Sequence, residues 1–68
     1  MRYVVSTINF FDNDLKSEIV EADSKIESML VYLSKEDIKF LGDNPTEDDI
    51  KQFYFDMDSM INSIKIPN

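Results

Sequence analysis

TEDDIKQFYFDMDSMINSI, residues 46–64, is the stretch that decides the predicted fold. Its apolar side chains recur at spacings of three and four residues, which places them on one face of an α-helix. The members of this apolar stripe are Ile50, Phe53, Tyr54, Met57, Met60, Ile61 and Ile64. Thr46 is a good N-cap, and Asp49 stands where a capping box has its reciprocal acid. The stretch therefore predicts one long C-terminal helix over residues 46–64, with its stripe in the core.

The opposite side of this predicted helix is acidic and carries one aromatic ring. Glu47, Asp48 and Asp49 fill the first turn, where the positive end of the helix dipole favours carboxylates. Phe55 points away from the apolar stripe and shares its face with Asp48 and Asp58. An aromatic ring surrounded by polar groups is typical of an interface centre, although single exposed apolar residues are also ordinary.

The first third of the chain predicts a β-hairpin. Residues 2–11 are rich in β-branched and aromatic types and contain no Gly or Pro, which favours a strand. Asp12, Asn13 and Asp14 favour a turn, and residues 15–22 form the returning strand. Both faces of the first strand are partly apolar, so we expect it to be covered on two sides or to pair outside its own chain. The turn lacks the Gly of a calcium loop, and no metal is predicted there.

The middle of the chain predicts two short helices. Ser24 and Glu27 form a capping-box pattern before apolar residues at helical spacing, which indicates a helix over residues 24–33. The cap signature repeats at residues 34–37, so a second helix is expected over 35–41, or one kinked helix instead.

Gly42 is expected to end the second short helix as a left-handed C-cap, before a turn at residues 43–45. The predicted fold is α+β: a single domain over residues 1–68, with an N-terminal β-hairpin packed on two short helices and one long C-terminal helix.

Composition argues against enzymes and cofactor proteins. The 68 residues include no Cys and no His, which removes disulfides, the usual zinc ligands and the commonest proton-transfer side chain. A single Gly leaves no phosphate-binding loop. We therefore expect no catalytic residues, no cofactor and no metal. The chain begins with no leader pattern and contains no apolar run of about 20 residues, so we expect a cytoplasmic protein.

Charge favours a basic protein as partner. Fourteen acids against seven bases give a net charge of −7, which repels nucleic acid and anionic membranes and attracts basic surfaces. The alternative is a solvated acidic surface that only keeps the protein in solution. The residues expected to contact a partner are Glu47, Asp48, Asp49, Phe55, Asp56 and Asp58.

One segment resembles a known family. Glu47-Asp48-Asp49 followed by Phe53-Tyr54-x-Asp56-Met57 is similar to a segment of the small anti-CRISPR proteins that block Cas9 by imitating PAM DNA. In broader style the chain resembles short acidic phage proteins that disable host defence enzymes. The resemblance implies that Glu47, Asp48, Asp49 and Asp56 imitate phosphates or bases, and that the protein acts in the cytoplasm of a host cell.

These observations lead to one expected function and two alternatives. The first is an inhibitor that blocks a basic nucleic-acid-binding partner, a host defence effector of the CRISPR type, by nucleic-acid mimicry. The second is a structural or assembly subunit that forms a homodimer through its first strand. The third is an antitoxin-like antidote for a basic toxin, which shares the electrostatics of the first.

Overall fold

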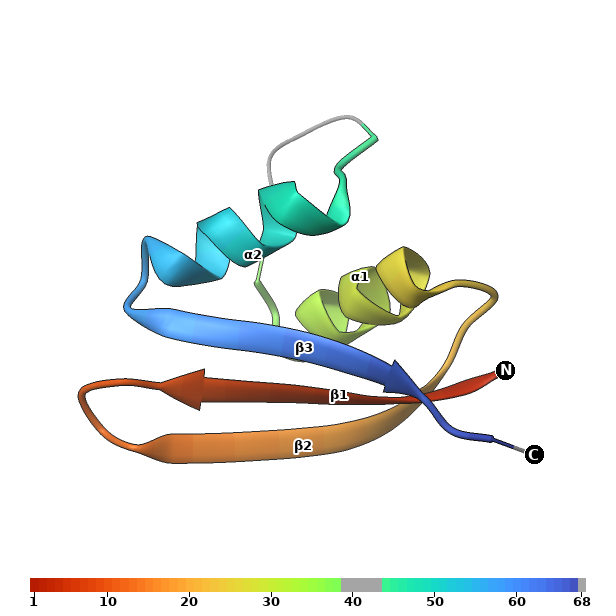
Figure 1. Ribbon diagram of the computed structural model, residues 1–68, viewed down its shortest axis with the longest axis horizontal. Coiled ribbons are helices and arrows are strands. Elements are labelled where there is room, and N and C mark those ends of the chain that lie inside the picture. Colours follow the sequence, from red (N-terminus) through yellow and green to blue (C-terminus); the bar gives the residue numbers. More distant parts are fainter. Residues whose placement is uncertain (39–43, 68) are drawn as a thin grey trace.

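The computed structural model describes residues 1–38 and 44–67, which form a three-stranded sheet and two helices (Figure 1). The elements follow the order β1 (Arg2–Asn9), β2 (Asp14–Glu21), α1 (Lys25–Lys35), α2 (Glu47–Phe55) and β3 (Ser59–Lys65). The sheet is antiparallel throughout and has the order β2-β1-β3. Both helices lie on one side of the sheet, α1 against all three strands and α2 against β3. The fold is therefore α+β, with two layers.

The long C-terminal helix predicted over residues 46–64 is wrong. α2 ends at Phe55, a turn follows, and the chain returns as strand β3 along β1. Asp58 takes a left-handed backbone conformation with φ of 56°, which no helix interior accepts. A two-stranded hairpin is marginal in water, so pairing a third strand with it outweighed the local preference for more helix.

The predicted apolar stripe is accordingly split between two elements. Ile50 and Tyr54 are buried on α2 as expected, while Ile61 is buried from a strand. Met60 and Ile64 are exposed on the other side of β3, because successive strand residues point to opposite faces. The spacing of the apolar residues 60, 61 and 64 is compatible with one face of a helix. The same residues also fit a strand that is apolar on both faces, so the sequence pattern alone did not distinguish the helix from the strand.

The predicted N-terminal hairpin is confirmed, with β1 and β2 in register from Arg2 opposite Glu21 to Asn9 opposite Asp14. β1 is the central strand of the sheet, with β2 on one side and β3 on the other. Backbone pairing of β1 with a second copy would therefore require β1 to give up β2 or β3.

The predicted helix over residues 24–33 is confirmed as α1, which runs two residues further. Ser24 is its N-cap, and the Ser24 hydroxyl accepts from the Glu27 N–H at 3.2 Å. The helix ends with Asp37 at a φ of 60° and with the Ile38 N–H bonded to the Leu33 carbonyl at 2.9 Å. This is the hydrogen-bond pattern of a Schellman motif.

The second short helix predicted over residues 35–41 is wrong in its first part. Lys35 is the last residue of α1, and residues 36–37 form a turn. Residues 39–41 and the predicted cap at Gly42 lie outside the described residues.

The core is a single cluster between the sheet and the helices. Its largest fully buried side chains are Tyr32 and Met29 from α1, Ile50 from α2 and Val5 from β1. Ser28 and Ser63 are also buried, and their hydroxyls pair at 2.6 Å. Among the described residues, neither helix has the length and apolar character needed to cross a bilayer.

Candidate functional site

Two turns that are far apart in sequence meet at one end of the molecule (Figure 1). The Phe10 N–H donates to the Asp58 carbonyl at 2.8 Å, which extends the β1–β3 ladder into the two turns. One turn joins β1 to β2, and the other joins α2 to β3. We refer to the exposed side chains of this end as the tip: Phe10, Phe11, Asp12, Asp14, Phe55, Asp56, Met57 and Asp58.

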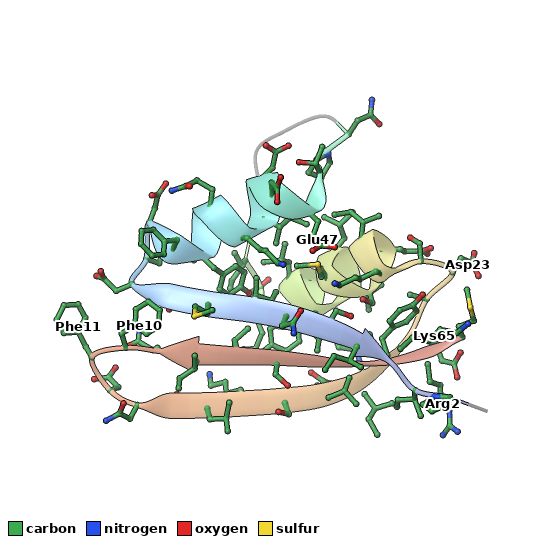
Figure 2. All side chains as sticks on the ribbon, in the orientation of Figure 1. Arg2, Phe10, Phe11, Asp23, Glu47 and Lys65 are labelled. Atoms are coloured by element: carbon green, nitrogen blue, oxygen red, sulfur yellow. The ribbon has the colours of Figure 1, made fainter. Side chains whose placement is uncertain are left out.

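The hairpin turn of the tip is built by Asn9. The side-chain Oδ1 of Asn9 accepts from the backbone N–H of Phe11 and of Asp12, both at 3.0 Å. Asn13 then reverses the chain at a left-handed φ of 51°, which Asn tolerates better than most residues. This geometry leaves Phe11 80% exposed at the far end of the hairpin (Figure 2).

The second turn of the tip is held by Asp56 and Ser59. Asp56 is the C-cap of α2, and its Oδ1 accepts from the Gln52 Nε2 at 2.9 Å. The Ser59 hydroxyl donates to the Met57 carbonyl at 3.2 Å and accepts from the Asn9 Nδ2, also at 3.2 Å. The two turns are therefore linked by side chains as well as by the strand ladder, and the tip has one defined shape.

The tip combines acidic and apolar side chains. Its four carboxylates belong to Asp12, Asp14, Asp56 and Asp58, and none of them forms an ion pair with a described Lys or Arg. Its large apolar side chains belong to Phe10, Phe11, Phe55 and Met57, all of which are exposed. Aromatic anchors beside unpaired charges form a surface that can bury rings in a partner and pair with the partner's cations.

Three of the predicted partner-binding residues, Phe55, Asp56 and Asp58, lie in this tip. The sequence reasoning missed Phe10, Phe11, Asp12 and Asp14, which it assigned to the hairpin without a functional role. The sequence does contain the two acid-rich turns, but only the β1–β3 register brings them together.

Glu47 and Asp49 have structural roles at the other end of α2. Glu47 pairs with Lys51 at 2.8 Å and with Lys25 at 3.3 Å, and it lies beside α1 (Figure 2). The hydrogen bond from Lys51, helped by Lys25, holds the pKa of Glu47 below its usual value. Asp49 accepts from the Thr46 N–H at 2.9 Å while the Thr46 hydroxyl accepts from the Asp49 N–H, so the predicted capping box is confirmed.

Asp48 lines a groove of about 500 Å³ between α2 and β3. Lys51 and Gln52 lie on the same wall, Met60 and Asn62 come from the strand, and Phe55 continues the groove to the tip. The structure thus brings Asp48 and Phe55 to one surface, and it separates both from Asp49.

A smaller cavity of about 280 Å³ lies beneath the tip, lined among others by Asp12, Tyr54 and Met57. The Tyr54 hydroxyl is buried and has no hydrogen-bond partner among the described residues, and burial raises its pKa. By contrast, the Tyr32 hydroxyl is within 3.0 Å of the Thr7 hydroxyl. Within residues 1–38 and 44–67, no three carboxylates are grouped closely enough to hold a metal ion.

The tip and the groove beside it thus combine the exposed Phe rings of the described chain with several acids that form no ion pair. No protein-family model, no curated protein and no solved structure matches this sequence or fold.

Proposed function

We propose that this chain is a protein-binding inhibitor that inserts its tip into the nucleic-acid site of a basic partner. The observation that carries the proposal is the convergence of three exposed Phe rings and four unpaired carboxylates on two adjoining turns. A surface that only kept the chain in solution would need the acids but not the rings.

The physical basis is competition for the same cationic groups. Lys and Arg side chains that bind phosphate groups can bind carboxylates instead. A net charge of −7 steers the chain toward such a basic surface. Aromatic side chains that stack on nucleic-acid bases also offer a surface for Phe10, Phe11 and Phe55. The rings supply the buried anchors, and the carboxylates supply orientation and speed of association.

The partner class follows from this chemistry. A basic groove with stacking side chains belongs to a protein that binds single-stranded or locally opened nucleic acid. The resemblance of residues 47–57 to PAM-mimicking anti-CRISPR proteins favours a host defence effector of the CRISPR type, in the cytoplasm of a host cell. The exposure of Asp48, Phe55 and Asp56 supports a role for this part of the segment in the contact.

The experiment compares two double variants that remove the same charge. D12N/D58N neutralises one acid on each turn of the tip, and Asn tolerates the left-handed backbone at position 58. E21Q/D23N neutralises two exposed acids outside the tip and serves as the matched control. Each protein is immobilised as bait in lysate of the source cell, with nuclease present, and the retained proteins are identified by mass spectrometry.

We expect a basic nucleic-acid-binding protein to be retained by the wild-type chain and the control, and to be lost from D12N/D58N. A Cas9–guide RNA complex is the first purified candidate, and displacement of a fluorescent PAM duplex from it measures inhibition. F11S should weaken displacement without changing the slope of its salt dependence, whereas D12N/D58N should reduce that slope. A partner retained equally by all variants, or one whose nucleic-acid binding is undisturbed, would contradict the proposal.

A further inference from the structure

The side of the sheet that faces away from the helices is an ordered, uncharged surface. We refer to it as the open face: Val4, Ser6, Ile8, Leu15, Ser17, Ile19, Met60, Asn62 and Ile64. Leu15, Ile19, Met60 and Ile64 are 57–67% exposed, so large apolar side chains on both outer strands face the solvent.

The strand register arranges the open face in three rows across the sheet. One apolar row is Ile19–Val4–Ile64, the other is Leu15–Ile8–Met60, and the polar row Ser17–Ser6–Asn62 lies between them. The Ser6 and Ser17 hydroxyls are 2.9 Å apart and bond to each other. The middle row therefore already satisfies part of its own hydrogen bonding and can be covered at low cost.

The absence of charge from these three rows is notable in this chain. Nearly a third of its residues are charged, yet the nine members of the open face include none. Charges return only at the ends of the rows: Arg2 lies opposite Glu21 in the strand register, and the tip begins with Asp58 at the other end. Figure 2 shows Arg2 at the end of the sheet away from Phe10 and Phe11. An uncharged patch with a charged rim has the composition of a protein interface.

We propose that the open face is the interface of a symmetric homodimer, in which two sheets pack face to face. A two-fold axis over Ser6 places apolar rows on apolar rows and the polar row on itself, so the face is complementary to its own copy. The three rows contain no charged side chain that a second copy would have to bury. They also contain no carboxylate with which the cations of a basic partner could pair, so a second copy fits this face better than a basic partner does.

Charge at the ends of the rows selects the direction of the strands in the dimer. With the two β1 strands parallel, Arg2 of one copy would approach the partner's Arg2. With the strands antiparallel, Arg2 lies near the acidic tip of the partner, where its charge is attracted. The antiparallel dimer places Ile19 opposite the partner's Leu15, and Ile64 opposite the partner's Met60, with sheets about 10 Å apart.

The surface area of the open face is small for a dimer interface and favours a dimer of modest affinity. Three strands about 4.8 Å apart and three rows about 6.8 Å apart give a patch that buries on the order of 500 Å² per chain once its side chains interdigitate. A stable interface needs a total of about 1,000 Å² or more, so the open face of two copies reaches the lower limit. We expect a Kd in the micromolar range, and added salt should strengthen the dimer because it screens the repulsion between two acidic chains.

Sedimentation equilibrium of the full chain, from roughly 10 μM to 1 mM, tests the proposal over the range in which a micromolar Kd is measurable. We expect a mass that rises toward twice the 8.0 kDa of one chain. I19K and I64K each place a charge in an apolar row and should raise the dimer Kd roughly 30-fold or more. S34K adds the same charge at an exposed position of α1, on the other side of the sheet, and should leave the Kd unchanged.

Isotope-filtered NMR on a mixture of labelled and unlabelled chains locates the interface directly, even where a variant folds poorly. We expect intermolecular methyl contacts from Ile19 to Leu15 and from Ile64 to Met60. A chain that remains monomeric at 1 mM overturns the proposal, as does a dimer whose intermolecular contacts involve Phe11 or Phe55. Binding of the monomer to neutral phosphatidylcholine vesicles through Leu15 and Ile64 would assign the open face to a membrane and would also overturn it.

Because the tip and the open face share no side chain, the two proposals fail separately. I19K would remove the dimer and leave partner displacement in place, whereas D12N/D58N would abolish partner displacement and would weaken the dimer only through the contact of Arg2 with the tip.

Discussion

The side-chain amide of Asn9 donates to the Ser59 hydroxyl at 3.2 Å, and this contact joins two turns that lie 50 residues apart in sequence. The same Asn9 side chain accepts from the backbone of Phe11 and Asp12. One residue thus shapes the hairpin turn and fixes it to the start of β3. The tip depends on this residue more than on any of the acids it displays.

Replacing Asn9 with Ala should therefore destabilise the fold. The change removes two accepted hydrogen bonds and one donated hydrogen bond at partly exposed sites, so we expect the free energy of unfolding to fall by about 1–2 kcal/mol. Urea unfolding followed by circular dichroism at low protein concentration measures the loss. N62A, at an exposed position of β3, is the matched control and should change the free energy by less than about 0.5 kcal/mol. Equal losses in both variants would remove the special role given to Asn9.

The two buried tyrosines of the helices should respond in opposite ways to loss of the hydroxyl. Y54F deletes a buried hydroxyl without a partner among the described residues, so stability should be unchanged or higher by up to about 1 kcal/mol. Y32F breaks the contact with Thr7 and should cost about 1 kcal/mol. Chemical denaturation of both variants makes the comparison. A clear loss of stability in Y54F would show that its hydroxyl is satisfied after all.

Alkaline pH should destabilise the protein through Tyr54. Burial raises the pKa of Tyr54, so the unfolded chain releases this proton at about pH 10 while the folded chain still holds it. The contribution of the protonated Tyr54 side chain to the free energy of unfolding is fully present below about pH 10. It is lost as the pH rises from there through the raised pKa of the folded state. Thermal unfolding between about pH 9 and 11 should therefore show a smaller decline for Y54F than for the wild type. Parallel declines would contradict this source of the pH dependence.

The capping box of α2 offers a test of local stability. T46A removes the hydroxyl that accepts from the Asp49 N–H, and loss of such an N-cap costs about 1 kcal/mol. S34A changes an exposed hydroxyl inside α1 and should alter the free energy of unfolding by less than about 0.5 kcal/mol. Urea midpoints of the two variants report the difference, and a T46A midpoint equal to that of the wild type would argue against the cap.

Glu47 should titrate below the usual value for a glutamate side chain, because its pKa is lowered. The hydrogen bond from Lys51, together with Lys25, lowers its pKa, so its stabilising effect is present above the unfolded pKa and is lost as pH falls through the folded value. An NMR titration of the side-chain carboxyl carbons measures the shift, with K51M as the variant that should remove most of it. E47Q should leave partner binding unchanged, since Glu47 lies outside the tip and its charge is already paired. Reduced partner binding by E47Q would indicate that Glu47 contacts the partner, as the sequence predicted.

Local hydrogen-bond signals in the sequence were sufficient for several parts of this structure. The helix caps at Ser24 and Thr46 depend on contacts within three residues, and both were predicted correctly. The hairpin, predicted with strands over residues 2–11 and 15–22, joins neighbouring strands through one short turn and is confirmed with strands Arg2–Asn9 and Asp14–Glu21. Composition likewise supported a small folded chain with an acidic surface and without cysteine chemistry. Phe55, singled out because it left the apolar stripe, is indeed exposed.

Tertiary structure alone decided that Ser59–Lys65 is a strand. The apolar spacing of Met60, Ile61 and Ile64 is compatible with a helix, and only the unsatisfied edge of β1 selects the extended form. That choice also creates both candidate surfaces, because it places Asp58 beside Phe10 and adds Met60 and Ile64 to the open face. The sequence by itself determined which residues are acidic, aromatic or able to cap a helix. The pairing of β3 with β1, a contact across 50 residues or more, determined which of them share a surface.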